Sequence, residues 1–380
     1  MRLGIDASNL RIGGGITHLV ELLGAARPRE HGIHRVVVWT YGQLASQLPP
    51  RPWLTVVPEP LLDRPLPFRL LWQTVRLTRL AAKACDILFA PGGIYAGSFR
   101  PFVTMSRNML PFERRERQRY GFSWMGLRLS LLRVAQSRGF RQASGVIFLS
   151  RYACSTVMKQ VPGIKGEIAI IPHGVVPQFL APPRPQRPLT DYSFAAPFRL
   201  LYVSILDVYK HQEQVVQAVA LLRQEGLPVK LDLVGPAYPP VLSRLSAVLG
   251  ELDPQGNFIN YVGPLPYAEI PGVNRDADAF VFASSCENMP NILLEAMASG
   301  LPIACARRGP MPEVLGEAGV YFDPEDPSSI AAALRTLLFS PELRARWAQA
   351  AYQRARGFSW EQCAQQTFEF LAQVASGAGR

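Results

Sequence analysis

Residues 284–302 read S-S-C-E-N-M-P-N-I-L-L-E-A-M-A-S-G-L-P and follow an apolar run, A-D-A-F-V-F-A, at positions 277–283. The apolar run predicts a buried strand. Beyond it, Asn288 is a candidate helix cap, Pro290 suits the first helical turn and Gly300 marks a helix end. The pattern therefore predicts a strand that leads into a helix N-terminus at the carboxyl edge of a sheet, where amides and the helix dipole favour an anion such as phosphate.

Two carboxylates flank this predicted helix start. Glu287 lies just before the helix, and Glu295 lies eight residues further on, in its second turn. Both could accept hydrogen bonds from hydroxyl groups of one ligand whose phosphates lie between them. A diphosphate with a sugar at each end matches that layout. On the two residues alone, a dipole-complementing Glu287 and a solvated Glu295 explain the pattern equally well.

Several motifs in order carry a family resemblance. The segment E-N-M-P-N-I-L-L-E-A-M-A-S-G-L-P-I resembles the E-x7-E signature of the retaining glycosyltransferases of family four, also called group 1. L-L-Y-V-S-I-L-D-V-Y-K-H-Q at 200–212 resembles the family's first donor-domain strand with its phosphate-binding lysine, and I-I-P-H-G-V at 170–175 resembles the strand that ends the first domain. Residues 311–324 and F-S-W at 358–360 fit the family's tail, so the resemblance covers nearly the whole chain.

The length of 380 residues, with 48% hydrophobic and 18% charged residues, indicates two globular domains. Apolar strands alternate with helices, which predicts parallel sheets. A proline-rich stretch at 177–197 is the expected linker. The resemblance implies an α/β GT-B fold, with two doubly wound Rossmann-like domains facing a central cleft. We place the acceptor-side domain at 1–177, the donor-binding domain at 178–365, and a tail at about 366–380 that returns to the first domain. Strands are predicted at 3–7, 35–40, 55–57, 87–90, 103–106, 146–149, 168–171, 200–204, 230–234, 257–262, 279–283, 303–306 and 320–322.

The resemblance also implies roles for residues of the second half. Glu295 would hold the ribose hydroxyls of the donor, and Glu287 would orient the transferred sugar as a catalytic residue. Lys210 would bind the diphosphate and stabilise the leaving group, together with the segment Asn288, Met289, Pro290 and Asn291. The chain departs from the family at Ile205, where an arginine often accompanies the lysine.

Two features of the first half belong to the same hypothesis. A glycine run, Gly13-Gly14-Gly15, follows the first strand, and the resemblance places Gly14 and Gly15 near the donor phosphates. The run is not the G-x-G-x-x-G fingerprint, which disfavours a nicotinamide-dependent dehydrogenase. Asn108 is the nearest counterpart of a histidine that many relatives carry, and it could only position a substrate by hydrogen bonding. An ordinary loop and a loop-capping asparagine are the alternatives, and His173 is expected to be structural.

The formal net charge of +11 suits an anionic partner. No nucleic-acid module is recognisable, so nucleic acid is not expected. Arg69, Arg76, Arg79 and Lys83 fall at helical spacing, and residues 114–141 carry eight arginines among aromatic residues. Basic amphipathic helices bind anionic membranes, although ordinary solvated helices show the same pattern.

The combined hypothesis is a retaining glycosyltransferase, such as a mannosyltransferase, that moves a sugar from a GDP- or UDP-sugar to a glycan or lipid-linked acceptor in cell-surface polysaccharide or lipopolysaccharide assembly. No cofactor and no essential metal are expected. The five separated cysteines and the early first strand favour free thiols, no signal peptide and a cytoplasmic enzyme, peripheral on the membrane. A nucleotide-sugar 2-epimerase and a non-catalytic nucleotide-sugar-binding protein remain alternatives.

Overall fold

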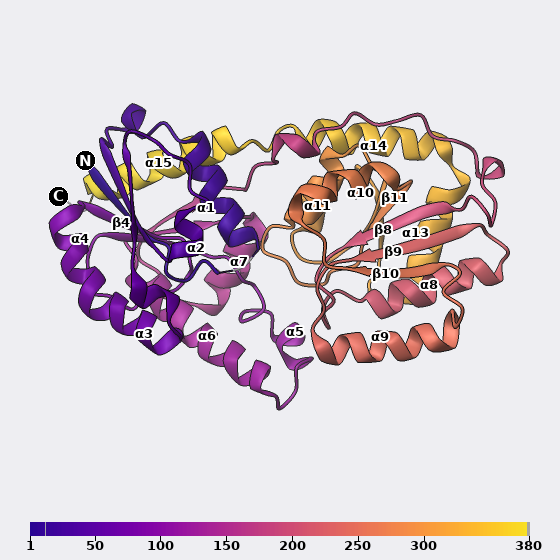
Figure 1. The fold of residues 1–380 in the computed structure, drawn as a ribbon, viewed down its shortest axis with the longest axis horizontal. Coiled ribbons are helices and arrows are strands. Elements are labelled where there is room, and N and C mark those ends of the chain that lie inside the picture. Colours follow the sequence, from indigo (N-terminus) through magenta and orange to yellow (C-terminus); the bar gives the residue numbers. More distant parts are fainter. Residues whose placement is uncertain (12, 378–380) are drawn as a thin grey trace. The chain divides into compact units, whose positions relative to one another are not determined.

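The structure is a computed structural model that describes residues 1–11 and 13–377. The chain divides into two compact units, each described by itself (Figure 1). Unit 1 comprises Met1–Arg117, Gly121–Gly174 and the described residues from Phe358 onward. Unit 2 comprises Gln118–Tyr120 and Val175–Gly357.

Unit 1 is built on a seven-stranded parallel sheet in the order β3-β2-β1-β4-β5-β6-β7. Strand β1 pairs with β2 on one side and with β4 on the other, so the strand order reverses between β1 and β4. In doubly wound sheets, ligands bind outside the carboxyl ends of the strands at such a point. The strands are β1 (Arg2–Asp6), β2 (Arg35–Thr40), β3 (Leu54–Pro58), β4 (Ile87–Ala90), β5 (Phe102–Met105), β6 (Gly145–Phe148) and β7 (Glu167–Ile170).

One long helical stretch of unit 1, residues 66–84, changes type along its length. It starts as α3 (Leu66–Leu71), continues as a π-helix, η3 (Trp72–Leu77), and ends as α4 (Thr78–Ala84). The remaining helices assigned to this unit are α1 (Gly14–Ala25), η1 (Pro28–His31), α2 (Gly42–Ala45), η2 (Pro60–Asp63), α5 (Arg114–Gln118, whose last residue joins unit 2), α6 (Trp124–Gln142), α7 (Arg151–Gln160) and α15 (Trp360–Gly377).

Unit 2 has a six-stranded parallel sheet in the order β10-β9-β8-β11-β12-β13. Helices α10, α11 and α14 lie on one side of this sheet, and α8 and α9 lie on the other (Figure 1). The strands are β8 (Phe198–Val203), β9 (Val229–Val234), β10 (Ile259–Gly263), β11 (Ala279–Phe282), β12 (Ile303–Ala306) and β13 (Val320–Phe322). The helices are η4 (Pro177–Phe179), η5 (Leu189–Asp191), α8 (Gln212–Gln224), α9 (Pro239–Leu252), η6 (Tyr267–Glu269), α10 (Ile270–Asp276), α11 (Asn291–Ala298), α12 (Met311–Leu315), α13 (Pro327–Phe339) and α14 (Pro341–Ala355).

The proline-rich stretch at 177–197 holds only the short helices η4 and η5 and belongs to unit 2. The fully buried Arg344 of α14 fixes it, because its guanidinium donates to the side-chain oxygen of Gln186 and to the carbonyl of Arg187. The same guanidinium lies 5.1 Å from the ring centroid of Phe198. The linker is therefore packed against unit 2 by a buried cation.

All thirteen predicted strands are present within two residues of their predicted bounds. The domain boundaries need three corrections. Unit 1 ends at Gly174 rather than 177, Gln118–Tyr120 joins unit 2, and the return to unit 1 begins at Phe358 rather than at about 366. The return is earlier because α15 is one continuous helix whose first residue, Trp360, already stacks on His173 of unit 1. The predicted tail residues 378–380 lie outside the described residues.

Candidate active site

Lys210 and Glu287, which are 77 residues apart in the sequence, form an ion pair at the carboxyl edge of the unit 2 sheet. Lys210 follows β8 and Glu287 follows β11, and these two strands are neighbours. The pair is shielded from water, since the side chains are 5% and 16% exposed. The ammonium also lies 5.0 Å from the Tyr209 ring centroid and 5.3 Å from that of Phe282. Low exposure strengthens the interaction of such a cation with an incoming phosphate.

The loop that carries Lys210 is fixed by hydrogen bonds to its backbone. The Lys210 amide donates to the Asp207 carbonyl at 2.9 Å, and the Tyr202 hydroxyl donates to the Lys210 carbonyl at 2.6 Å. The Ser285 amide donates to the Tyr209 carbonyl at 2.8 Å, which joins this loop to the one that carries Glu287. The two predicted residues are therefore held together by their own loops.

His211 adds a further contact between the Lys210 loop and the Glu287 loop, and its backbone is strained. Its ring nitrogen Nε2 lies 2.9 Å from the Ser285 hydroxyl oxygen. Its φ of 52° makes it the non-glycine residue with left-handed backbone among the described residues, at the N-cap of α8. Such a conformation costs about 1 kcal/mol or more for a residue with a side chain. The sequence offered no signal for this strain.

The start of α11 differs from the prediction. The helix begins at Asn291, with Pro290 at its N-cap rather than in its first turn, and without a side-chain cap. The buried Asn288 is thus not the cap, because two further residues intervene before the helix. The Asn291 amide donates to the Met289 carbonyl at 3.0 Å, and Pro290 has no N–H. In this conformation, neither Pro290 nor Asn291 offers an amide to a diphosphate.

Glu295 lies in the second turn of α11, as predicted, but it is not a freely solvated helix residue. Burial raises its pKa to about 7, and a hydrogen bond from the Tyr267 hydroxyl at 2.7 Å opposes this rise. Tyr267 comes from η6, on a different segment, and sequence reasoning missed it. A carboxyl group that changes charge near neutral pH is a functional-site candidate.

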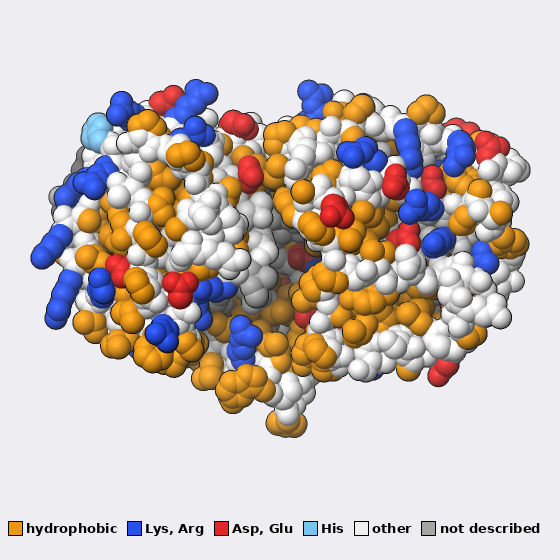
Figure 2. Space-filling view, viewed as in Figure 1, with side chains coloured by type: hydrophobic (Ala, Val, Ile, Leu, Met, Phe, Trp, Pro, Cys, Tyr) orange, Lys and Arg blue, Asp and Glu red, His pale blue; other side chains and the backbone are white. Residues whose placement is uncertain are grey.

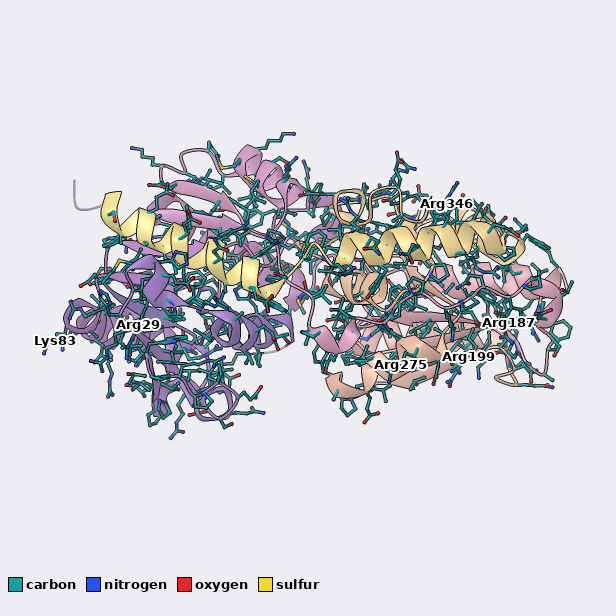
Figure 3. The ribbon with its side chains drawn as sticks, turned by 90° about the horizontal axis from the view of Figure 1, so that it is seen from above. Arg29, Lys83, Arg187, Arg199, Arg275 and Arg346 are labelled. Atoms are coloured by element: carbon teal, nitrogen blue, oxygen red, sulfur yellow. The ribbon has the colours of Figure 1, made fainter. Side chains whose placement is uncertain are left out.

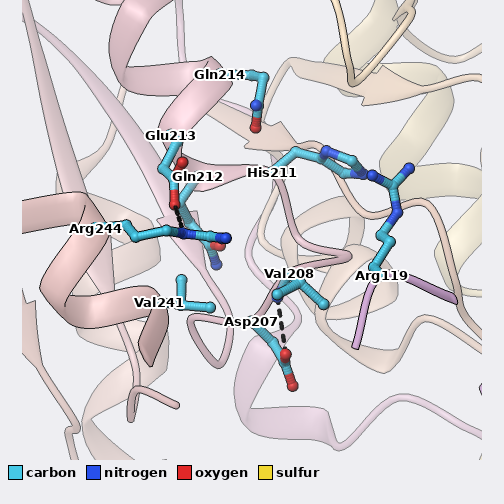
Figure 4. Close-up of a pocket in the computed structure, with 9 residues that line it drawn as sticks. All are labelled: Arg119, Asp207, Val208, His211, Gln212, Glu213, Gln214, Val241 and Arg244. Atoms are coloured by element: carbon cyan, nitrogen blue, oxygen red, sulfur yellow. Dashed lines mark hydrogen bonds and ion pairs between the residues drawn. The ribbon is translucent and has the colours of Figure 1, made fainter. Parts of the chain in front are cut away.

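A pocket of about 330 Å³ adjoins the N-terminus of α8 (Figure 4). Its charged side chains include Arg119, which pairs with Glu325, and Arg244, which pairs with Glu213 at 3.0 Å. Sequence analysis missed both arginines as pocket residues. Arg119 had no detectable signal, because it precedes the rest of unit 2 by more than fifty residues. The pocket is lined by Arg119, Asp207, Val208, His211, Gln212, Glu213, Gln214, Val241 and Arg244.

The glycine run of unit 1 is not a plain loop. Gly14 and Gly15 are the first two residues of α1, and Gly13 is its N-cap with φ 59° and ψ −140°. That conformation is open essentially to glycine only. At Gly15, by contrast, a Cβ would meet the guanidinium Nη2 of Arg107 at 3.6 Å, an ordinary contact, so that position does not require glycine.

Asn108 and His173 have structural contacts within unit 1. The Asn108 side-chain oxygen accepts from the Leu110 amide at 3.0 Å, which is a loop-capping turn. His173 is buried and stacks on Trp360, with ring centroids 5.4 Å apart. His18 of α1 lies 4.7 Å from His173, and burial lowers its pKa well below the usual range. These two histidines fix α15 and α1 to one another.

The predicted basic face at 69–83 needs correction, because the π-helix changes the spacing within this helical stretch. Arg69 is partly buried and donates to the Ser8 carbonyl, and Arg76 pairs with Glu59 at 3.5 Å. Of the four, Arg79 and Lys83 are exposed with no ion pair to their side chains among the described residues, and Figure 3 shows Lys83 pointing away from unit 1. Apolar side chains are exposed nearby instead: Leu66, Phe68, Leu71, Val75, Phe122, Trp124, Leu127, Leu131 and Val134. Figure 2 shows apolar side chains gathered over α3 and α6.

None of the described helices combines the length and apolar character needed to cross a bilayer. Among the residues outside the gaps at 12 and 378–380, no group of three or more His, Cys, Asp and Glu side chains could hold a metal ion. The five cysteines are free.

Residues 193–354 match the family described as glycosyl transferases group 1. The O-antigen chain mannosyltransferase B of Escherichia coli is 31% identical over 186 residues, which cover 47% of this chain and 47% of that protein. The D-inositol 3-phosphate glycosyltransferase of Corynebacterium efficiens is 33% identical over 173 residues, 43% of this chain and 40% of that protein. The matched region thus spans less than half of these curated relatives.

Two solved structures resemble the whole chain. HepE of Anabaena, solved in complex with UDP, superposes with a TM-score of 0.69 over 98% of this chain and 99% of its own, at 21% identity. A sucrose-phosphate synthase of Thermosynechococcus elongatus gives a TM-score of 0.76 over 99% of both chains, at 19% identity. The fold of this chain is α/β of the GT-B class.

Proposed function

Since this chain belongs to the glycosyl transferases group 1 through residues 193–354, we propose that it is a retaining glycosyltransferase. Its donor is a nucleotide-diphosphate sugar and its acceptor is a glycan or lipid-linked glycan in cell-surface polysaccharide assembly. The observation that carries the proposal is the shielded ion pair between Lys210 and Glu287 at the carboxyl edge of unit 2. An incoming diphosphate competes with Glu287 for the ammonium, which leaves the carboxylate available to accept from sugar hydroxyls.

The chemistry needs charge stabilisation where the leaving group forms. The bond between the anomeric carbon and the diphosphate breaks, and the acceptor oxygen bonds to the same carbon from the same face. The acceptor's proton passes to the leaving phosphate oxygen, so no protein base is required. Lys210 stabilises the negative charge that develops on the diphosphate. Glu287 orients the sugar, Glu295 holds the ribose, and the backbone around Asn288 and Met289 borders the phosphates.

The donor is proposed to be a UDP- or GDP-sugar. A structural neighbour of the same fold binds UDP, and another structure of it contains UDP-glucose. A relative over 47% of this chain is a mannosyltransferase, which favours mannose among the sugars to be tested. A screen of UDP-, GDP- and ADP-sugars for thermal stabilisation identifies the donor, since a ligand at one hundred times its dissociation constant adds about 2.7 kcal/mol.

Catalysis separates this proposal from its alternatives. Transfer of the sugar to an acceptor glycan with retained anomeric configuration supports the proposal. Conversion of the nucleotide-sugar alone to its epimer supports a 2-epimerase instead. Donor binding without turnover, unchanged by Glu287→Ala, supports a binding protein. Full activity in the presence of a chelator is expected, because Lys210 supplies the cation that a metal would otherwise provide. Loss of activity that magnesium restores would contradict this.

The exposed apolar face of α6 is proposed to bind an anionic membrane. Trp124, Leu127, Leu131 and Val134 are exposed at helical spacing, at 77, 51, 61 and 69%. Exposed arginines, Arg128 and Arg138, lie on the same helix. An apolar stripe beside cations matches the interface of an anionic bilayer. Cosedimentation with anionic vesicles tests this proposal. We expect it to be lost in Leu131→Glu and retained in Gln47→Glu, a control that adds the same charge at an exposed position away from α6.

A further inference from the structure

Two arginines of unit 1 lie at the carboxyl edge of its sheet, beside the point where the strand order reverses. Arg11 follows β1, and its guanidinium carbon lies 4.1 Å from the Tyr41 ring centroid. Arg69 of α3 donates to the Ser8 carbonyl at 3.3 Å and to the Asn9 side-chain oxygen at 3.5 Å. Each guanidinium retains a buried nitrogen with no hydrogen-bond partner among the described residues, Nη2 of Arg11 and Nε of Arg69.

The nearby carboxylates do not neutralise these cations. Asp6 at the end of β1 accepts from the Ser8 amide at 3.0 Å and from the Gln73 amide at 2.6 Å. Glu59 pairs with Arg76 instead. Within residues 1–11 and 13–377, no ion pair involves Arg11 or Arg69. Burial lowers the pKa of Arg69, and the positive charge of Arg11 lowers it further.

The π-helix explains why Asp6 is not the missing counterion. Gln73 lies in η3, fully buried, and its amide nitrogen reaches both Asp6 and the Ser8 hydroxyl, the latter at 2.9 Å. Its side-chain oxygen accepts from the Ala96 amide at 3.3 Å. The Asp6 carboxylate is thus bound by the neutral amide of Gln73 and not by Arg69. π-Helical turns recur at functional sites.

We propose that Arg11 and Arg69 bind a phosphate group of the acceptor substrate. This inference rests on the proposed function. It adds a class of acceptor, about which the family match of residues 193–354 says nothing. Two guanidinium groups match the charge of a phosphate dianion, and their forked donors match its oxygens. A carboxylate would leave one positive charge uncompensated. The place also fits, since ligands of doubly wound sheets bind at the reversal of strand order.

Binding of simple phosphates tests the site directly. Thermal unfolding is measured with inorganic phosphate and glycerol 3-phosphate for the native chain, Arg11→Gln/Arg69→Gln, Lys210→Met and Arg29→Gln. Arg29 is an exposed arginine of the same unit and serves as the matched control (Figure 3). We expect at least about tenfold weaker phosphate binding in the double variant, because each lost charge-assisted contact is strong. The Arg29→Gln variant keeps the whole response, and Lys210→Met keeps the part of it that depends on Arg11 and Arg69. An unchanged response in the double variant overturns the proposal.

A second pair of variants guards against misfolding. Arg11→Lys and Arg69→Lys keep the charge but lose the fork, and we expect weaker phosphate binding with a native circular dichroism spectrum. Equal phosphate affinity in both lysine variants and the native chain would also overturn the proposal.

The source of the phosphate is resolved by comparing two probes. Loss of glycerol 3-phosphate binding in the double variant assigns a soluble phosphorylated acceptor. Loss of binding to vesicles that contain phosphatidic acid, relative to phosphatidylcholine alone, assigns a lipid phosphate. Donor stabilisation is measured in parallel. If no nucleotide-sugar stabilises any variant while phosphate binding still depends on Arg11 and Arg69, the proposed function fails and the phosphate site stands.

Discussion

The carboxyl edges of the two sheets handle charge in opposite ways. In unit 2, the cation Lys210 is paired with Glu287 across neighbouring strands. In unit 1, the carboxylate of Asp6 is bound by the amide of Gln73, and the cations Arg11 and Arg69 have no acidic partner in the part of the chain that the structure describes. The same parallel architecture thus gives a neutral pair in one unit and an uncompensated positive charge in the other.

The difference indicates what each edge requires from a ligand. A paired edge can be preorganised without ligand, because each charge already has a partner. An edge with two like charges gains most from an external anion, which removes their repulsion. Unit 2 is therefore suited to a ligand with both an anion and hydroxyl groups, and unit 1 to an anion alone.

The largest expected effect is loss of transfer on Lys210→Met. Removing a preorganised stabiliser of developing charge costs about 10²–10³ in turnover, or roughly 2.7–4 kcal/mol of transition-state stabilisation. Steady-state kinetics with the identified donor measure this loss. Lys159→Met, an exposed lysine, is the control and retains activity.

Stability separates the ion pair's structural role from its catalytic role. Lys210→Met leaves Glu287 partly buried without its cation, which is destabilising. The double variant Lys210→Met/Glu287→Gln recovers stability but stays inactive. Recovery of activity in the double variant would contradict the assigned role of Lys210.

The next largest expected effect is a loss of stability when Gln73 is replaced, since its amide binds the Asp6 carboxylate in unit 1. Gln73→Leu removes donors from Asp6 and Ser8 and is expected to destabilise the chain by about 2 kcal/mol, because a buried carboxylate loses a partner. Denaturant unfolding measures the change. Gln47→Leu, an exposed glutamine, stays within about 0.5 kcal/mol of the native value. Adding Asp6→Asn to Gln73→Leu should restore part of the lost stability, because the buried group is then uncharged. If the double variant is no more stable than Gln73→Leu, the charge of Asp6 is not the cause of the destabilisation.

The third effect is a pH dependence of donor binding through Glu295. The pKa of about 7 is raised above the usual carboxyl value, so the folded chain holds this proton more tightly than the unfolded chain. The stability that this tighter proton binding contributes is fully present below the pKa of Glu295 in the unfolded chain, and it is lost as pH rises towards 7. Donor hydroxyls need the carboxylate, so donor affinity should rise up to about tenfold per pH unit below 7 and level off above it. Calorimetric titration across this range tests it, and Glu295→Gln should remove the dependence.

Sequence reasoning predicted the fold well because its signals are local. Parallel strands such as 87–90 and 303–306 are short apolar runs between helices, and both were predicted with their observed bounds. The sequence also indicated that Lys210 and Glu287 lie at the same sheet edge, because each belongs to the loop that follows a predicted strand, and the two strands, β8 and β11, are neighbours.

Other site features depend on contacts that no spacing reveals. Gln73 reaches Asp6 from a π-helix, which an ordinary helical period does not predict. Tyr267 meets Glu295 from a separate short helix. The cap of α11 was misplaced because Asn288 and Pro290 satisfy a common capping pattern two residues before the helix begins. Tertiary packing decides such details.

The smallest effect concerns the strained backbone beside Lys210. His211 combines a φ of 52° with a contact to Ser285, so a single substitution changes strain and contact together. Comparing His211→Gly with His211→Ala isolates the strain, because both lose the imidazole and only glycine relaxes the backbone. We expect the glycine variant to be more stable than the alanine variant. Relief of backbone strain contributes about 1 kcal/mol to this difference, and the greater backbone entropy of glycine in the unfolded chain offsets a smaller part of it. Denaturant unfolding measures the difference, and equal stabilities would show that the left-handed backbone carries no strain. Transfer should fall in both variants, since each removes the imidazole contact to Ser285 that helps to hold the Lys210 loop.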